Sequence, residues 1–338
     1  MKIVVPVMAG IGNAVMTVPM VRRLGAGHQV VVEASSAVIG EVFDRLDEVA
    51  NVVVLPASLR ERLRVHRGLR GDWYVVPFPS NRWEYTALAA TSRCANVLIH
   101  DYPTGAMRTG RRLLGATRVP AQRGIHDVEQ NLALVDGLQP AGSQRPELDP
   151  VFPIRDSERK QATALQTPAV VQVGCADTVV GRAKRLPDAT WAAVVDQLAD
   201  RGVACTLIEG PDEQGDGRRV ADLCRSSPPV LPLTGTLGTS AAVLAQAELF
   251  VGVDSGLAHV AAAVGVPKVV TVFTAADPER VAPWGHRDRV VTPRDTDGRS
   301  WSPRLLYPMD HPKPKLRNDR IDWSRHVDAG DIVSRSLA

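Results

Sequence analysis

The chain has 338 residues, of which 44% are hydrophobic and 23% are charged. This length exceeds what one hydrophobic core usually serves and predicts two domains, and the composition excludes a disordered chain. The net charge of +3 is too small a surplus to indicate nucleic acid as the main partner.

No cysteine pair has the CxxC spacing of a zinc site or a redox dithiol. In a chain of this length, the four cysteines are interpreted as reduced thiols of a cytoplasmic protein. The chain opens with the strand-like run KIVVPV rather than the pattern of a signal peptide. Since no segment reaches the roughly 18 apolar residues of a membrane span, at most peripheral membrane contact is expected.

The first half of the chain alternates predicted strands with predicted helices. An apolar strand over residues 3–7 leads into a glycine turn at residues 10–13 and then a helix over residues 14–24. Further strands are expected at residues 29–33, 51–55, 73–76 and 96–100. Strands that alternate with helices indicate a parallel sheet.

Residues 139–168 interrupt this alternation with several prolines, and they predict a linker plus one short strand. A second alternation follows, with strands at 169–173, 204–208, 249–253 and 268–273 and helices at 188–201, 240–246 and 328–337. The expected domains are residues 1–150 and 151–310. Residues 311–338 form a tail or helix that could pack back on the N-terminal domain.

The most informative segment is ELFVGVDSGLAHVAAAVGVP, residues 248–267. A buried strand runs into Asp254 and Ser255, and Ser255 is expected to cap a helix that includes His259 in its first turn. Gly256 allows a ligand to approach the backbone, and a helix N-terminus suits a phosphate. An ordinary capped strand–helix junction would account equally well for this segment alone.

Two other segments strengthen the phosphate interpretation. Lys184 follows a loop that starts at Gly174, after a predicted strand, and such a loop with a lysine can bind an anion. Glu213 follows the strand TLI, where a carboxylate can hold the hydroxyls of a ribose. Taken singly, each segment is more typical of a solvated surface than of a binding site.

Together these segments resemble glycosyltransferase family 9, which includes the ADP-heptose heptosyltransferases of lipopolysaccharide synthesis. The resemblance rests on QVGCADTVVGRAKRLP, EGPDE, VDSGLAHVAAAVGVP and VAPWG, and on HDVEQNLALVDGL and the opening GIGNAVMTVPMVRRL, and it covers most of residues 1–290.

The resemblance implies a GT-B fold, in which two Rossmann-like parallel-sheet domains face each other across a cleft. It implies an inverting, metal-independent transfer, most often of heptose from ADP-heptose, to an acceptor in lipopolysaccharide or another glycan or metabolite. No cofactor is expected beyond the nucleotide-sugar co-substrate. Lys184, Asp254, Ser255 and Gly256 would hold the diphosphate or sugar, and Glu213 would hold the ribose.

In the first half, the resemblance implies that Gly12 keeps its loop close to the sugar. Lipopolysaccharide heptosyltransferases have an aspartate after this loop, interpreted as the catalytic base, where this chain has Asn13. An amide cannot accept a proton at neutral pH. Another carboxylate such as Asp101 could serve instead, the acceptor could need little help from a base, or the protein could be inactive.

Two further patterns have competing interpretations. The basic run at residues 60–67 either contacts a phosphorylated acceptor or forms a solvated helix face. Asp295 and Asp297 match the Asp-x-Asp metal motif of other transferases, but they lie in a polar tail and are predicted to form a loop rather than a metal site.

Two other functions remain open. Gly10 and Gly12, with Glu33 closing the second strand, resemble a dinucleotide-binding unit of an oxidoreductase, although Val15 occupies the third glycine position. Asn13 also fits a non-catalytic sugar-nucleotide binder. The sequence does not identify the acceptor, the sugar, the nucleotide, the catalytic base or the oligomeric state.

Overall fold

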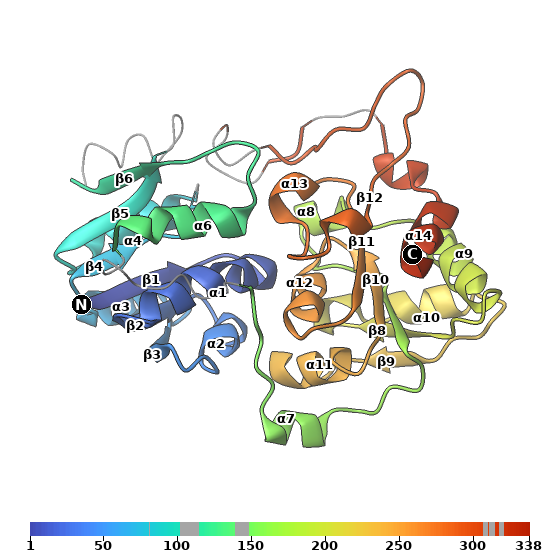
Figure 1. The fold of residues 1–338 in the computed structure, drawn as a ribbon, viewed down its shortest axis with the longest axis horizontal. Helices are drawn as coiled ribbons and strands as arrows, with labels where there is room; N and C mark the ends of the chain where they lie inside the picture. The colour runs from blue at the N-terminus through green and yellow to red at the C-terminus, as the bar shows by residue number, and fades with distance from the viewer. Residues whose placement is uncertain (81, 102–114, 139–148, 307–309, 311–314, 318–320) are drawn as a thin grey trace. The chain divides into compact units, whose positions relative to one another are not determined.

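The computed structural model describes residues 1–80, 82–101, 115–138, 149–306, 310, 315–317 and 321–338. The chain forms two compact units, each built on its own parallel sheet (Figure 1). The first unit comprises Met1–Pro153 and Leu306–Lys315, and the second comprises Ile154–Leu305 and Leu316–Ala338. Two parallel-sheet units are what the sequence predicts.

The first sheet has the strand order β3-β2-β1-β4-β5-β6, and every neighbouring pair is parallel. Its strands are β1 (Lys2–Val7), β2 (Gln29–Ala34), β3 (Val49–Val54), β4 (Trp73–Val75), β5 (Asn96–Asp101) and β6 (Thr117–Pro120). The order reverses between β1 and β4, which makes the carboxyl ends of these strands the expected position for a ligand.

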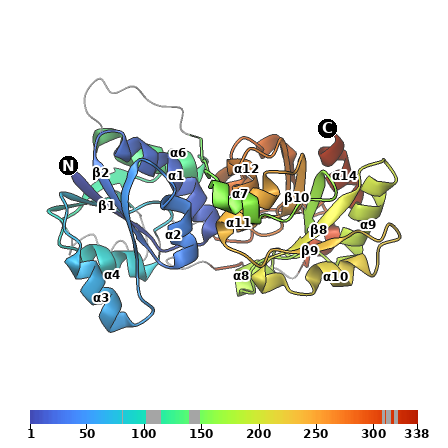
Figure 2. The ribbon, with the colours of Figure 1, turned by 90° about the horizontal axis from the view of Figure 1, so that it is seen from below.

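The helices of this unit are α1 (Ile11–Gly25), α2 (Ala37–Phe43), α3 (Leu59–Gly68), α4 (Trp83–Thr91), α6 (Asp127–Val135) and the 3₁₀ turn η1 (Asp136–Leu138). Helix α1 packs against α2 and α6. Helices α3 and α4 lie side by side, and the Nε2 atom of His66 on α3 is 2.9 Å from the carbonyl oxygen of Leu88 on α4 (Figure 2).

The second sheet has the order β12-β11-β10-β7-β8-β9, again parallel throughout. Its strands are β7 (Ala169–Gln172), β8 (Cys205–Glu209), β9 (Val230–Pro232), β10 (Leu249–Val253), β11 (Lys268–Val272) and β12 (Val290–Val291). Counted from β7, this is the same order as in the first sheet, so the reversal lies between β7 and β10.

The helices of the second unit are α7 (Asp156–Gln161), α8 (Val179–Arg182), α9 (Asp188–Ala199), α10 (Asp216–Ala221), α11 (Leu237–Leu244), α12 (Gly256–Ala263), α13 (Pro278–Val281) and α14 (Ala329–Leu337). Short 3₁₀ turns are η2 (Pro211–Glu213), η3 (Arg287–Arg289) and η4 (Trp323–His326). Within the described part of the chain, no helix is long and apolar enough to cross a membrane.

Two local predictions differ from the structure. Helix α1 begins at Ile11, so Gly12 and Asn13 belong to its first turn rather than to a preceding glycine turn; Gly10 is extended and ends the loop. The short strand predicted within residues 139–168 is absent from the described residues 149–168, which instead contain helix α7. There Glu158 accepts a hydrogen bond from the backbone N–H of Arg155 and closes the first turn.

The closing helix α14 belongs to the second unit. It contacts α9 (Figure 1), and its Ile332 and Val333 are buried in the core that contains Trp191. The salt bridge between Arg294 and Asp331 fastens it to the segment after β12. The reason is the apolar side of α14, which completes the hydrophobic core around α9.

Candidate functional site

The candidate site lies where the strand order of the second sheet reverses. Gln172 ends β7, and Asp254 and Ser255 follow the neighbouring strand β10 directly. All five residues of β10 are buried, which fixes the position of the two polar residues at its carboxyl end. In sheets of this topology, ligands bind at this reversal, beyond the carboxyl ends of the strands.

Ser255 caps the start of helix α12, as predicted. Its Oγ accepts a hydrogen bond from the backbone N–H of Ala258 at 3.3 Å, and the left-handed Gly265 (φ +86°) follows the other end of the helix. The N–H groups of Gly256 and Leu257 have no carbonyl partner within the helix, because they lie in its first turn. With the helix dipole, they favour an anion at this position.

Lys184 lies against the same helix start. Its Nζ is 2.6 Å from Oδ2 of Asp254 and donates to the backbone carbonyl oxygen of Asp254 at 3.1 Å. Both side chains are largely buried, with exposed fractions of 16% and 7%. The Asp254 carboxylate therefore holds the Lys184 ammonium group next to the free N–H groups of α12. Both kinds of group attract a negatively charged ligand.

A chain of hydrogen bonds links Ser255 to Glu213. The Ser255 hydroxyl donates to Oε1 of Gln172 at 2.6 Å, and Nε2 of Gln172 donates to Oε1 of Glu213 at 2.6 Å. The backbone N–H of Gly210 donates to the other Glu213 oxygen at 2.9 Å. Burial raises the pKa of Glu213 above its ordinary value, and these two donors oppose that shift.

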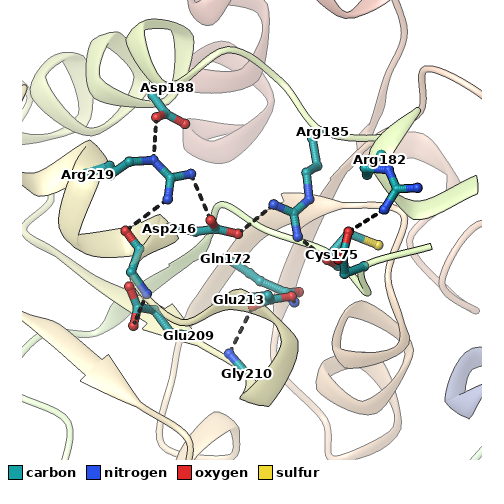
Figure 3. A network of polar contacts seen from close by, with 12 residues as sticks. Gln172, Cys175, Arg182, Arg185, Asp188, Glu209, Gly210, Glu213, Asp216 and Arg219 are labelled. Atoms are coloured by element: carbon teal, nitrogen blue, oxygen red, sulfur yellow. Dashed lines mark hydrogen bonds and ion pairs between the residues drawn. The ribbon is translucent and has the colours of Figure 1, made fainter. Parts of the chain in front are cut away.

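A second charged network lies beside Glu213 (Figure 3). Asp216 lies between two arginines: its Oδ2 is 2.9 Å from Nη1 of Arg185, and its Oδ1 accepts from Nη2 of Arg219 at 2.8 Å. Arg185 also donates to the carbonyl oxygen of Cys175 at 2.6 Å. These contacts join the loop after β7 to the start of α10.

Gly174 shows how closely these groups pack. A Cβ atom at this position would lie 2.7 Å from Cγ of Glu213 and 2.8 Å from Oδ2 of Asp216. Any side chain would therefore displace one of the two carboxylates, so the site requires glycine here.

The structure brings the predicted residues of the second half together. Lys184, Asp254, Ser255 and Glu213 form one connected set through Gln172, Gly256 is the first residue of α12, and His259 is buried on the same helix. The roles predicted for them stay predictions. Asp216 and Arg219 belong to no motif in the sequence. Gln172 opens the segment QVGCADTVVGRAKRLP, and the one local signal for it is its place as a polar residue at the end of an apolar strand.

The candidate residues of the first half lie at the carboxyl edge of the first sheet. Gly12 and Asn13 are in the first turn of α1, directly after β1, and Asp101 is the last residue of β5. One strand, β4, separates β1 from β5, so the strand ends are about 10 Å apart. Asn13 is part of a helix, and its carbonyl oxygen accepts from the Thr17 hydroxyl at 2.8 Å.

Glu33, the acidic residue of the dinucleotide interpretation, is fully buried. One of its oxygens is 2.7 Å from Nδ1 of His66, and the other accepts from the Tyr74 hydroxyl at 2.6 Å. Because Glu33 has no exposed atom and bonds to two side chains of the first unit, this arrangement argues against the dinucleotide-binding interpretation.

The basic run at residues 60–67 lies on a helix, whereas the Asp295–Asp297 pattern lies in a turn. The arginines of residues 60–67 are on α3, while His66 of the same run points into the core. Asp295 and Asp297 are exposed in a tight turn in which Asp295 accepts from the Ser300 hydroxyl, so the predicted loop is confirmed. Among the residues the structure describes, no group of three or more His, Cys, Asp or Glu is arranged to hold a metal ion.

Solved structures share this architecture. A glycosyl transferase family 9 protein from Veillonella parvula has a TM-score of 0.72 at 17% identity, covering 87% of this chain and 88% of that one. ADP-heptose lps heptosyltransferase II from E. coli has a TM-score of 0.69 at 22% identity, covering 88% and 92%. At these identities the likeness shows the fold alone, and that fold is the expected GT-B class.

Sequence comparison gives shorter matches to curated proteins. Lipopolysaccharide heptosyltransferase 3 from Escherichia coli is 38% identical over 103 residues, which is 29% of this chain and 30% of that protein. Lipopolysaccharide heptosyltransferase 1 from Escherichia coli strain K12 is 34% identical over 114 residues, 33% of this chain and 35% of that protein. These matches span about a third of the length of the curated relatives.

The family profile covers more of the chain. The profile described as glycosyltransferase family 9 (heptosyltransferase) matches residues 98–299, well over half of the sequence. This range includes the whole connected set around Lys184, Glu213 and Asp254. The chain therefore belongs to glycosyltransferase family 9, the heptosyltransferase family.

Proposed function

We propose that the protein transfers a sugar from a nucleotide-diphosphate donor to an acceptor, with heptose from ADP-heptose as the first choice. The observation that carries this proposal is the position of Lys184, held by Asp254 beside the free N–H groups of α12. The names of the related heptosyltransferases support the choice of sugar.

In this proposal the donor diphosphate binds the N–H groups of Gly256 and Leu257 and the ammonium group of Lys184. Asp254 cannot bind phosphate directly, because a carboxylate repels it; its role is to hold Lys184 and to accept from sugar hydroxyls. Glu213 accepts from the ribose with the lone pairs that Gln172 and Gly210 leave unused.

The proposed chemistry is a single displacement at the anomeric carbon. An acceptor oxygen attacks as the bond from that carbon to the diphosphate oxygen breaks, and the configuration inverts. Negative charge grows on the leaving diphosphate, where Lys184 and the start of α12 stabilise it. This arrangement supplies the positive charge without a metal ion. Asp101 takes the acceptor proton, and Asn13 orients the acceptor.

The acceptor is proposed to be a glycan such as lipopolysaccharide, or a secondary metabolite. The exposed arginines of α3 favour an acceptor with phosphate groups, because a guanidinium group binds phosphate with two parallel hydrogen bonds. His259 is buried on α12, the helix whose start is proposed to bind the diphosphate.

A second candidate function is a sugar-nucleotide binder without transfer activity. Asn13 favours it, because an amide in the first turn of α1 cannot remove a proton from an acceptor. Single-turnover reactions with bound donor separate the two functions: a binder keeps the donor intact with every acceptor tried.

Calorimetry with ADP-heptose tests the donor site. Lys184→Ala should weaken binding by about 10- to 150-fold, because one charge-assisted contact is lost. Lys160→Ala, an exposed lysine on α7, is the matched control and should bind as the wild type does. Unchanged affinity in Lys184→Ala for ADP-heptose and for other nucleotide sugars would remove the basis of this site.

Transfer should also persist in EDTA. Loss of transfer in EDTA that manganese restores would contradict the metal-free mechanism.

A further inference from the structure

The backbone just before Lys184 is tied to the segment that follows strand β11. Thr274 lies two residues after β11, and its hydroxyl donates a hydrogen bond to the carbonyl oxygen of Ala183 at 3.0 Å. Figure 1 shows β11 and α8, the two elements whose ends this bond joins. Thr274 is only 1% exposed. It cannot touch a donor itself, so any effect that it has on the donor passes through Ala183 and Lys184.

The loop that carries α8 has few other anchors. Residues 176–179 are exposed, and Val179 is exposed by 69%. The other hydrogen bonds that the structure describes for residues 176–183 stay within the loop, such as the bond from the backbone N–H of Gly181 to the Thr178 hydroxyl. A helix of four residues is not stable through its own propensity. The contact with Thr274 is therefore what fixes the end of this loop.

Lys184 is fixed between two anchored residues. Before it, Ala183 accepts from Thr274; after it, Arg185 lies 2.9 Å from a carboxylate oxygen of Asp216. A lysine reaches its ligand on a flexible four-carbon stem, so the position of its charge depends on where its backbone is held. Loss of the bond to Ala183 would free one of the two anchors.

Thr274 is itself held from the opposite direction along the chain. The indole N–H of Trp301 donates to the carbonyl oxygen of Thr274 at 3.3 Å. The backbone N–H groups of Arg304 and Leu305 both donate to the carbonyl oxygen of Ala275 at 2.8 Å. The segment at residues 301–305 therefore fixes the backbone of Thr274 while its hydroxyl is bonded to Ala183.

We propose that Thr274 is a positioning residue for Lys184, and that Trp301 holds Thr274 in place. The two residues then set the affinity for the donor diphosphate without touching the donor. This inference rests on the proposed function, because it takes Lys184 as the residue that binds the diphosphate. It adds a determinant of donor affinity that lies in the segment after β11.

Calorimetry with ADP tests the role of the hydroxyl. Thr274→Val keeps the shape of the side chain but loses the donor to Ala183, so ADP should bind about three- to tenfold more weakly. Thr274→Ser keeps the hydroxyl and should bind ADP within about twofold of the wild type. The matched control is Thr271→Val, a buried threonine of β11 whose hydroxyl has no hydrogen bond to any described residue; it should bind ADP as the wild type does.

A double-mutant cycle shows whether Thr274 acts through Lys184. In a Lys184→Ala protein, the additional change Thr274→Val should alter ADP affinity by less than about twofold, because the group that Thr274 positions is gone. Three results would overturn the inference: wild-type affinity in Thr274→Val, an equal loss in Thr271→Val, or an equal loss from Thr274→Val with and without Lys184.

The same measurements separate this inference from the proposed function. If Lys184→Ala binds ADP as the wild type does, the donor site itself is wrong and the role of Thr274 with it. If Lys184→Ala binds weakly and Thr274→Val binds normally, only the role of Thr274 is wrong. Should Thr274→Val fail to fold, Trp301→Phe decides, since it removes only the indole N–H from Thr274. It should weaken ADP binding about threefold when Lys184 is present, and wild-type affinity would overturn the inference.

Discussion

At the scale of single residues, the site depends on one amide that the sequence did not mark. Gln172 is the last residue of a buried strand, and its side chain joins Ser255 to Glu213 with two hydrogen bonds of 2.6 Å. A glutamine can do this because it both donates and accepts. A carboxylate at the same position could accept from Ser255 but would repel Glu213.

Gln172→Glu should therefore make stability depend on pH. Burial raises the pKa of Glu213 in the folded state, so the folded protein binds that proton more tightly than the unfolded chain. A second carboxyl at this position raises the pKa of the pair further. The variant should lose less stability at pH 5 than at pH 8, with a difference of up to about 3 kcal/mol, because the buried pair carries more negative charge as the pH rises.

Urea unfolding at the two pH values measures this difference. Gln214→Glu is the matched control, since it adds the same charge at an exposed neighbouring position. A Gln172→Glu protein that is equally stable, relative to wild type, at pH 5 and pH 8 would show that Gln172 does not contact Glu213.

The catalytic base is the other question at this scale. Asn13→Asp places a carboxylate in the first turn of α1, where the helix dipole stabilises it by about 0.3–1 kcal/mol, so folding should not suffer. We expect this variant to change the rate of transfer by less than about tenfold. Asp101→Asn should slow transfer by about 10²- to 10⁴-fold, the usual contribution of a general base.

Single-turnover rates with bound donor measure both variants. Asn51→Asp, at an exposed position of the edge strand β3, controls for the added charge. A large gain from Asn13→Asp alone would contradict the proposed roles and would show that this chain lacks a base at that position.

At the scale of elements, the packing of the C-terminal helix α14 against the core of the second unit can be tested by mutation. Ile332 is completely buried and Leu337, on the same helix, is 41% exposed. Ile332→Ala should lower the free energy of unfolding by about 2–5 kcal/mol, because it leaves a cavity beside α9. Leu337→Ala should change it by less than about 0.5 kcal/mol. Equal effects in calorimetric unfolding would mean that α14 is not docked as described.

The elements that the sequence predicted well have both an apolar period and marked ends. Strand β10 is a run of buried residues, and Ser255 and Gly265 delimit the helix after it. The missed strands β6, β9 and β12 are short. Strand β6 contains an arginine and a proline, β9 ends in a proline, and β12 has only two residues. Their strand conformation comes from pairing with longer neighbours, which no local pattern records.

Helix α7 was missed for a related reason. It has six residues, none of them apolar, and its surrounding prolines indicate a linker. Its local signal was Glu158, three residues after Arg155, which closes the first turn. The same carboxylate packs against α11, where a Cβ atom on Gly238 would overlap it. Tertiary contact therefore fixes this short helix more than its own propensity does.

At the scale of the whole molecule, the two units repeat one strand order, and in both the candidate residues lie at the carboxyl edge. The alternation of strands and helices was enough to predict this edge as the position of the sites. It could not predict which side chains meet there, because the contacts of Arg185 with Asp216, and of Gln172 with Glu213, join residues far apart in the sequence.

If the nucleotide binds the second unit alone, it should slow hydrogen exchange within that unit and not in the first. ADP at 100 times its dissociation constant stabilises a binding unit by about 2.7 kcal/mol, which slows hydrogen exchange through unfolding about 100-fold. We expect slower exchange in peptides that cover residues 169–176 and 249–258, and in α14, which shares their core. Peptides that cover α3 and α4 should not change, since ADP lacks the sugar that would approach Gly12.

Exchange measured by mass spectrometry with and without ADP tests this, and Lys184→Ala is the internal control. That variant should lose the slowing at the ADP concentration that protects the wild type, and Lys160→Ala should keep it. Protection of residues 10–13 without any change at residues 249–258 would place the nucleotide on the first unit. Such a result would favour the dinucleotide arrangement that the buried contacts of Glu33 argue against.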